Sequence, residues 1–246
     1  MTGTVTNTDS LSLCGDDAAD FIAAPPRKLS ARTLTLDGGA FDPENHPSIT
    51  EIVLPRYPRL RHLTVMRWPA LTSLQVEGRI QGLSLSATGP LSAISPLPHL
   101  TELSGIPLHL LSGSLARVRE IHSCVIDEEA LSCVAELTAL KVLNGTSIRF
   151  DDLTVLRPLQ ALTAMRIRGR FTTLLGLEAL HRLKDIQVSS PHLHDISALA
   201  ELRGLRQLEL QGCAVLTDIS ALAGRKLNHI NLSGTKVRAA GIPASL

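Results

Sequence analysis

Two adjacent stretches, LKDIQVSSPHLHDISALAELRG from Leu183 to Gly204 and LRQLELQGCAVLTDISALAGRK from Leu205 to Lys226, share one pattern. Each is 22 residues long and contains DISALA. Each opens on an apolar-x-x-apolar-x-apolar box, whose alternation is typical of a β-strand. The later apolar residues are spaced by about three, which is typical of a short 3₁₀ or α turn. The pair therefore predicts two units of a repeat fold.

The same box recurs from the middle of the chain to its end, at intervals of 21 or 22 residues. The boxes begin at Val118, Leu140, Leu162, Leu183, Leu205 and Leu227. Apolar residues in the second half of each unit also form columns. One column is Leu131, Leu153, Leu174 or Leu175, and Ile196; the next is Val134, Leu156, Leu177, Leu199 and Leu222. We expect the boxes to be neighbouring parallel strands, with Asp195 and Asp218 capping the turns that follow.

The N-terminal half is less regular. Its boxes begin at Ala31, Ile49, Leu60, Leu71, Ile80 and Leu100. These are too close together to be successive parallel strands, which need long crossovers. The spacing is long enough when every second box is taken as a strand of one sheet, because Leu60, Ile80 and Leu100 are 20 residues apart and lead into the later series. Ile49 and Leu71 then predict strands on the opposite, convex side, and the loop from Gly38 to His46 absorbs the longer first step.

A single unit buries too little apolar surface to offset the entropy lost when it becomes ordered, so the units must stack as one array. We therefore predict an α/β solenoid with a parallel concave sheet and short helical or strand segments on the convex side. The repeat domain is expected over residues 29–246, irregular over 29–117 and regular over 118–246. Residues 1–28 are expected to form a flexible N-terminus and a cap, the cap being DDAADFIAA from Asp16 to Ala24.

The segments LELQGCAVLTDISALA and INLSGTKV resemble the leucine-rich repeats of the internalin type, whose pattern is LxxLxLxxNxIxDISxLxxLxx. The resemblance runs from Val118 to Val237 and implies a right-handed solenoid that binds other proteins on its concave sheet. The family places asparagine at the ninth position of the unit, where it forms a ladder with the backbone of adjacent turns. Here that column reads Ile126, Ile148, Arg170, Pro191, Cys213 and Thr235, so no asparagine ladder is expected.

In each box the first, fourth and sixth positions should point inward, and the third, fifth and seventh should face solvent. We predict a partner-binding surface on this concave face, centred on Arg166 and Arg168, because arginine forks suit carboxylates and phosphates. Its residues are Glu120, His122, Asn144, Arg166, Arg168, Asp185, Gln187, Gln207, Glu209, Gln211, His229 and Asn231. Cys124 and Thr146 fall in the outward seventh column. Two alternatives stay open: a merely solvated polar face, and arginines held in ion pairs with Asp185 and Glu209.

Other chemistry has weaker support. His192-x-His194-Asp195 contains metal-ligand types, but no further ligand set is marked by spacing. Cys124 and Cys133 with His122 could suggest a thiol nucleophile, although Cys133 lies near an inward column. GxSxG, Walker-type, GxGxxG and HExxH motifs are missing from the sequence. We therefore expect no metal site, no cofactor and no catalysis.

The composition of the chain indicates which classes of partner it can bind. The formal net charge is +1 and aromatic residues make up 2%, which argues against nucleic acid as the partner. There is no long apolar run typical of a membrane span. The N-terminal residues lack the pattern of a secretion signal and the four cysteines lack CxxC pairing, which predicts reduced thiols and a cytoplasmic location. We predict a monomeric, non-catalytic protein-binding module, an adaptor or sensor. An enzyme inhibitor or immunity factor and a structural self-assembly protein remain alternatives.

Overall fold

The computed structural model describes residues 9–39, 49–86 and 88–238. The chain divides into two compact units. Unit 1 is Met1–Ile106 with Gly113–Leu115, and unit 2 is Pro107–Ser112 with Ala116–Leu246. The division falls where the sequence changes from irregular to regular repeats. Most of the expected loop from Gly38 to His46, and residues 1–8 of the expected flexible N-terminus, lie outside the described residues.

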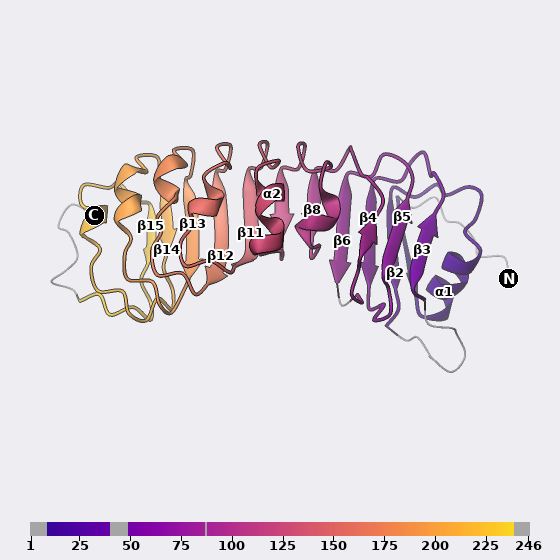
Figure 1. Ribbon diagram of the computed structural model, residues 1–246, viewed down its shortest axis with the longest axis horizontal. Helices are drawn as coiled ribbons and strands as arrows, with labels where there is room; N and C mark the ends of the chain where they lie inside the picture. The colour runs from indigo at the N-terminus through magenta and orange to yellow at the C-terminus, as the bar shows by residue number, and fades with distance from the viewer. Residues whose placement is uncertain (1–8, 40–48, 87, 239–246) are drawn as a thin grey trace. The chain divides into compact units, whose positions relative to one another are not determined.

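Unit 1 contains a main parallel sheet in which alternate strands of the sequence are neighbours. Its order is β1 (Ser10–Cys14), β2 (Thr33–Asp37), β4 (His62–Met66), β6 (Gly82–Ser86) and β8 (Glu102–Ser104). A separate parallel sheet consists of β3 (Glu51–Leu54), β5 (Ser73–Val76) and β7 (Ala93–Ile94). The boxes at Ile49 and Leu71 thus form strands outside the main sheet, as the alternate spacing predicts (Figure 1).

The main sheet begins earlier than expected. Residues Ser10–Cys14, assigned from sequence to the flexible region and cap, form β1 and pair in register with β2. The short SLSLC alternation supplies the strand, and Gly15 with φ +55° turns the chain into helix α1 (Asp16–Ala23). This helix packs against β1 and β3, as a cap would. The acidic DDAAD segment therefore follows a strand of the sheet.

Unit 2 repeats a strand and a short helical turn. Its parallel sheet has the order β9 (Glu120–His122), β11 (Val142–Ile148), β12 (Ala164–Gly169), β13 (Asp185–Ser189), β14 (Gln207–Glu209) and β15 (His229–Asn231), and β10 (Val125–Ile126) also pairs with β11. The helical segments are η1 (Leu108–Leu111), η2 (Glu128–Ala130), α2 (Leu131–Val134), η3 (Thr154–Leu156), η4 (Leu177–Ala179), η5 (Ser197–Glu201) and η6 (Ser220–Leu222). Figure 1 shows these turns on one side of the strands.

The register of unit 2 confirms the stacking of the repeats. Inward residues pair from strand to strand, in the order Leu143, Met165, Ile186, Leu208 and Ile230. The leucines that open the boxes, Leu140, Leu162, Leu183 and Leu205, are all buried and precede consecutive neighbouring strands. Aliphatic side chains thus line up turn upon turn, and the α/β solenoid expected from the sequence is confirmed.

The helical turns follow the expected columns with one exception. Val134, Leu156, Leu177, Leu199 and Leu222 are buried. Leu131, however, is 46% exposed and Ala130 is buried in its place, because this turn continues from 3₁₀ into α2. Leu174 and Leu175 are the two candidates for one position of a later turn, and Leu174 is buried whereas Leu175 is exposed. No helix in the described ranges is long and apolar enough to cross a membrane.

Candidate binding face

The side of the unit 2 sheet that faces away from the helical turns is here called the open face. Its side chains form three rows across the strands. The first row is Glu120, Val142, Ala164, Asp185, Gln207 and His229; the second is His122, Asn144, Arg166, Gln187, Glu209 and Asn231. The third contains Ser147, Arg168 and Ser189. The alternation of the strands thus brings eleven of the predicted residues into these rows, with Gln211 exposed just beyond β14.

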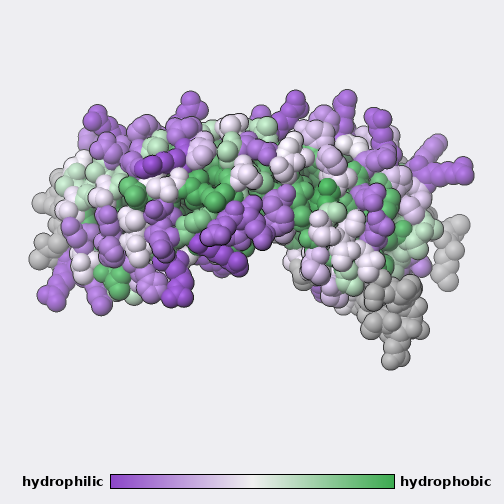
Figure 2. Space-filling model, viewed as in Figure 1, coloured by the Kyte–Doolittle hydropathy of each residue, from purple (hydrophilic) through white to green (hydrophobic). Residues whose placement is uncertain are grey.

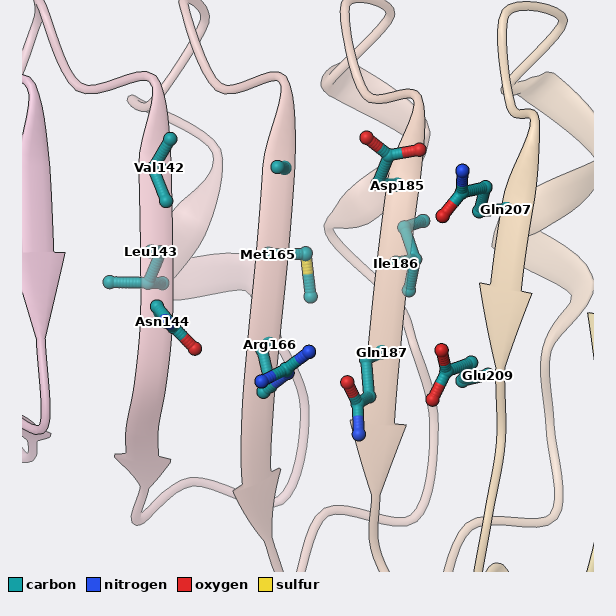
Figure 3. A pocket seen from close by; sticks show the side chains of 11 residues that line it. Val142, Leu143, Asn144, Met165, Arg166, Asp185, Ile186, Gln187, Gln207 and Glu209 are labelled. Carbon is teal, nitrogen blue, oxygen red and sulfur yellow. The ribbon is translucent and has the colours of Figure 1, made fainter.

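The open face is hollowed over four strands. Val142 and Ala164 are shorter than their neighbours Asp185 and Gln207 in the first row, which leaves a cavity of about 220 Å³ beside the second row. Figure 3 shows Arg166 at its edge, between Asn144 on β11 and Gln187 on β13. Polar side chains therefore surround a space large enough for one side chain of a partner.

Arg166 and Arg168 are the unpaired cations of this face among the described residues. Both are exposed on β12, separated by the buried Ile167. Within the described part of the chain, no hydrogen bond or ion pair joins either guanidinium group to another residue.

Two of the carboxylates on this face contact histidines instead of the arginines. Glu209 lies 4.0 Å from His229, and Glu120 lies 3.6 Å from His122. Asp185, on the neighbouring strand β13, forms no ion pair with a described residue. His122 also lies 3.4 Å from the amide of Asn144. Among the described residues neither arginine forms the ion pair with Asp185 or Glu209 that the sequence left open, and partner binding by this face stays a prediction.

Comparison with known proteins concerns the fold. No family model and no curated protein matches the chain. A solved internalin (inlF) from Listeria monocytogenes str. 4b F2365 aligns with it at a TM-score of 0.51 and 17% identity, over 86% of this chain and 70% of that one. This chain has the leucine-rich-repeat fold.

Two further leucine-rich-repeat structures also match. The functional domain of InlJ from Listeria monocytogenes, which includes a cysteine ladder, aligns at a TM-score of 0.42 and 14% identity, over 85% of this chain and 58% of that one. TLR13 in its complex with ssRNA13 aligns at 0.40 and 15%, over 93% of this chain and 50% of that one. The chain thus spans 58% and 50% of the length of these two structures.

The leucine-rich repeats around β9–β11 contain a bulge that the sequence pattern misses. Thr146 and Cys124, expected to face solvent, are 0% and 3% exposed. The pairing of β11 with β12 shifts at Asn144/Thr146, because Gly145 adopts φ +64° and adds a residue to the strand. Ser123 stacks on it with φ +54°. Ser147 and Val125 face outward instead, and the glycine inside the strand pattern is the signal that could have predicted this.

The ninth-position column is only partly buried. Ile126, Ile148 and Cys213 are buried, but Arg170 and Pro191 are exposed. Their neighbours Phe171 and Ser190 are buried instead, because the turn lengths after these strands differ by one residue. The Ser190 hydroxyl donates to the Phe171 carbonyl at 2.6 Å, and the Cys213 thiol donates to the Val188 carbonyl at 3.8 Å. These two groups bond to the previous turn, where the family uses asparagine.

The other candidate sites are not assembled. Asp195 binds the backbone of η5, and the described ranges contain no group of three or more potential metal ligands that includes it, His192 or His194. Burial raises the pKa of the Cys133 and Cys213 thiols, which disfavours a thiolate. The Cys124 thiol donates to the His122 carbonyl oxygen at 3.5 Å.

Proposed function

We propose that this chain is a non-catalytic protein-binding module that holds its partner on the open face of unit 2. The observation that carries the proposal is the pair of unpaired guanidinium groups, Arg166 and Arg168, beside a cavity of about 220 Å³. An exposed arginine at the centre of a face is a common energetic anchor of interfaces, because it combines charge, fork geometry and a long apolar stem.

The shape of the face supports a macromolecular partner. Neighbouring strands are about 4.8 Å apart, so rows that cross six strands extend for about 24 Å. The rows alternate amides, carboxylates and guanidinium groups, and such a mixed surface can match the charges of a folded protein residue by residue. The shallow cavity is lined by side chains of four strands and would accept one protruding side chain, as an anchor residue does.

The absence of catalysis is part of the proposal. Ser189 and Ser147, the hydroxyl groups of the third row, have no histidine within their row. The thiols of Cys124, Cys133 and Cys213 are buried, and all four cysteines are unpaired, which fits the reducing conditions of a cytoplasmic location. These features support a binding role for the protein in that compartment.

We favour an adaptor or sensor as the specific role. An enzyme inhibitor or immunity factor would use the same face. It would differ from an adaptor in its captured partner, which would be an enzyme that loses activity in the complex. A self-assembly protein would instead show a mass that rises with concentration in light scattering, whereas the binding module is expected to remain monomeric.

The test is affinity capture from lysate with the wild-type chain and with Arg166→Glu/Arg168→Glu. The matched control is Arg27→Glu/Lys28→Glu, which makes the same change in charge at two exposed positions of unit 1. We expect the open-face variant to lose one dominant captured protein that the control retains. Capture that is unchanged in the open-face variant would refute the proposal.

A further inference from the structure

Basic side chains gather along one edge of unit 2. Because the strands are parallel, the residues that precede each of them lie on the same edge of the sheet. Figure 2 shows hydrophilic side chains projecting from this edge, the upper one in the view. The residues that form what we call the basic rim are Arg119, Lys141, Arg182, Lys184, Arg203 and Arg206.

The cations of the basic rim have no internal partners. All six are exposed, and none forms an ion pair or a side-chain hydrogen bond with a residue that the structure describes. The carboxylates on the same edge are few. Glu178 is paired with Arg157 at 2.7 Å, and Glu136 accepts a hydrogen bond from Ser112, so neither is free to compensate the rim. Glu201, and Asp185 on the open face, form no ion pair with a described residue.

Carboxylates gather at the opposite edge, where the strands end. Asp127, Asp151, Asp152, Asp195 and Asp218 follow β10, β11, β13 and β14. The same edge also holds Arg149, which pairs with Asp127 at 3.6 Å, and the exposed Arg170 and Lys236. The formal net charge of +1 covers the whole chain, so it does not describe the field that the basic rim presents to a partner.

We propose that the basic rim docks an acidic polypeptide segment of the protein that the open face binds. The inference rests on the proposed function, since it assumes a protein partner. Side chains on one side of an extended segment recur about every 6.8 Å, and strand starts recur about every 4.8 Å. Lysine and arginine stems are long and flexible enough to bridge that difference, so neighbouring rim cations can each reach a carboxylate.

The chemistry beside the rim favours a polypeptide over a nucleic acid. The aromatic residues of unit 2, Phe150 and Phe171, follow strands and so lie at the edge opposite the rim, whereas single strands are usually held by stacking their bases on aromatic side chains. Glu120 directly follows Arg119, and Asp185 directly follows Lys184, so carboxylates border the rim on the open face. They repel a phosphate backbone laid across rim and face together. A protein can place its own basic residues opposite Glu120 and Asp185.

The experiment uses the full chain and a fluorescein-labelled oligoglutamate peptide as the probe, with binding followed by anisotropy. The rim variant is Lys184→Glu/Arg206→Glu. Its matched control is Arg170→Glu/Lys236→Glu, two exposed residues at the strand-end edge. A single-stranded oligonucleotide and a DNA duplex of equal charge are titrated in parallel, and circular dichroism checks that each variant is folded.

We expect the wild type and the control to bind oligoglutamate, and the rim variant to bind roughly tenfold more weakly or worse. The affinity should fall with added salt, because the rim is exposed. Equal binding by wild type and rim variant would overturn the proposal, and so would tighter binding of either nucleic acid than of oligoglutamate. This titration does not use the capture assay, so a failure of the rim and a failure of the open face are distinguishable.

Discussion

The Oδ1 atom of Asp195 accepts a hydrogen bond of 2.8 Å from the backbone N–H of Ser197, the first residue of η5. Asp218 binds Ser220 at the start of η6 in the same way, also at 2.8 Å. The first N–H groups of a helical turn have no partner inside it, so these carboxylates supply one. Both aspartates therefore cap the turns, as expected from the DIS motif.

Removing the cap should destabilise the array. We expect Asp195→Ala to lower the free energy of unfolding by about 1 kcal/mol, the usual value of a lost cap. Asp195→Asn keeps an acceptor oxygen and should lose less. Urea denaturation followed by circular dichroism measures both, and equal losses in the two variants would argue against capping.

Acid should destabilise unit 1 through Asp37. Arg67 Nε donates to Asp37 Oδ1 at 2.7 Å, and its Nη2 contacts Oδ2. The hydrogen bond from Arg67 holds the pKa of Asp37 below its ordinary value. A carboxyl group with a lowered folded pKa stabilises the fold fully above its unfolded pKa of about 3.9, and this stabilisation is lost as the pH falls through the folded pKa.

The pair of Asp37 and Arg67 can be tested with Asp37→Asn. The substitution should reduce stability near neutral pH and have much less effect at a pH below the folded pKa, where the native carboxyl group is protonated as well. Urea denaturation at the two pH values measures the difference. A loss of stability that is the same at both pH values would show that the charge of Asp37 does not stabilise the fold.

Thr146 and Ser190 should respond in opposite ways to loss of the hydroxyl group. Thr146 Oγ1 is buried without a hydrogen-bond partner among the described residues, whereas Ser190 Oγ donates to Phe171 at 2.6 Å. An unsatisfied buried hydroxyl costs about 1 kcal/mol or more. Thr146→Val should therefore stabilise the chain, and Ser190→Ala should destabilise it by about 1 kcal/mol. Thermal unfolding measures the stability of both variants, and a Thr146→Val variant that is less stable than the wild type would contradict the assigned bulge.

The bulge glycine should tolerate substitution better than the glycine before η4. A Cβ added at Gly145 would meet no atom closer than 3.5 Å, so Gly145→Ala carries mainly the cost of φ +64°, about 1 kcal/mol. At Gly176, with φ +111°, a Cβ would lie 2.4 Å from the backbone of Leu153. Gly176→Ala should be clearly more destabilising in the same urea assay, and equal losses would contradict this packing.

The cysteines should differ in reactivity. Cys14 is exposed, whereas Cys124, Cys133 and Cys213 are buried, and burial raises the pKa of the Cys133 and Cys213 thiols. A disulfide reagent at neutral pH should modify Cys14 rapidly in the native chain and the other three only after denaturation. Mass spectrometry of the labelled peptides identifies each site. Rapid labelling of Cys213 in the native state would contradict the assigned core.

The array itself could be predicted because it depends on periodicity. Intervals of 22 and 21 residues return Leu140, Leu162 and Leu183 to the same place, where all three are buried. The open face followed from the same register, since a strand that buries Ile167 must expose Arg166 and Arg168.

Other features could not be predicted, because they depend on single residues that break the period. The added residue at Gly145 moves Thr146 from solvent to core, and a shorter turn moves Ser190 into the place expected for Pro191. The strand Ser10–Cys14 was missed because it has only two apolar alternations, Leu11 and Leu13, and pairs with just one neighbour. The basic rim was missed because it requires the edges of several strands to be compared at once.

The central claim is that a partner protein contacts the open face of unit 2. Photo-cross-linking tests it most directly, with benzoylphenylalanine placed at Gln187 on this face or at Ala200, an exposed residue of η5 on the helical side. We predict one dominant cross-linked protein from position 187 and none from position 200. Cross-linking from Ala200 in the absence of cross-linking from Gln187 would contradict the claim.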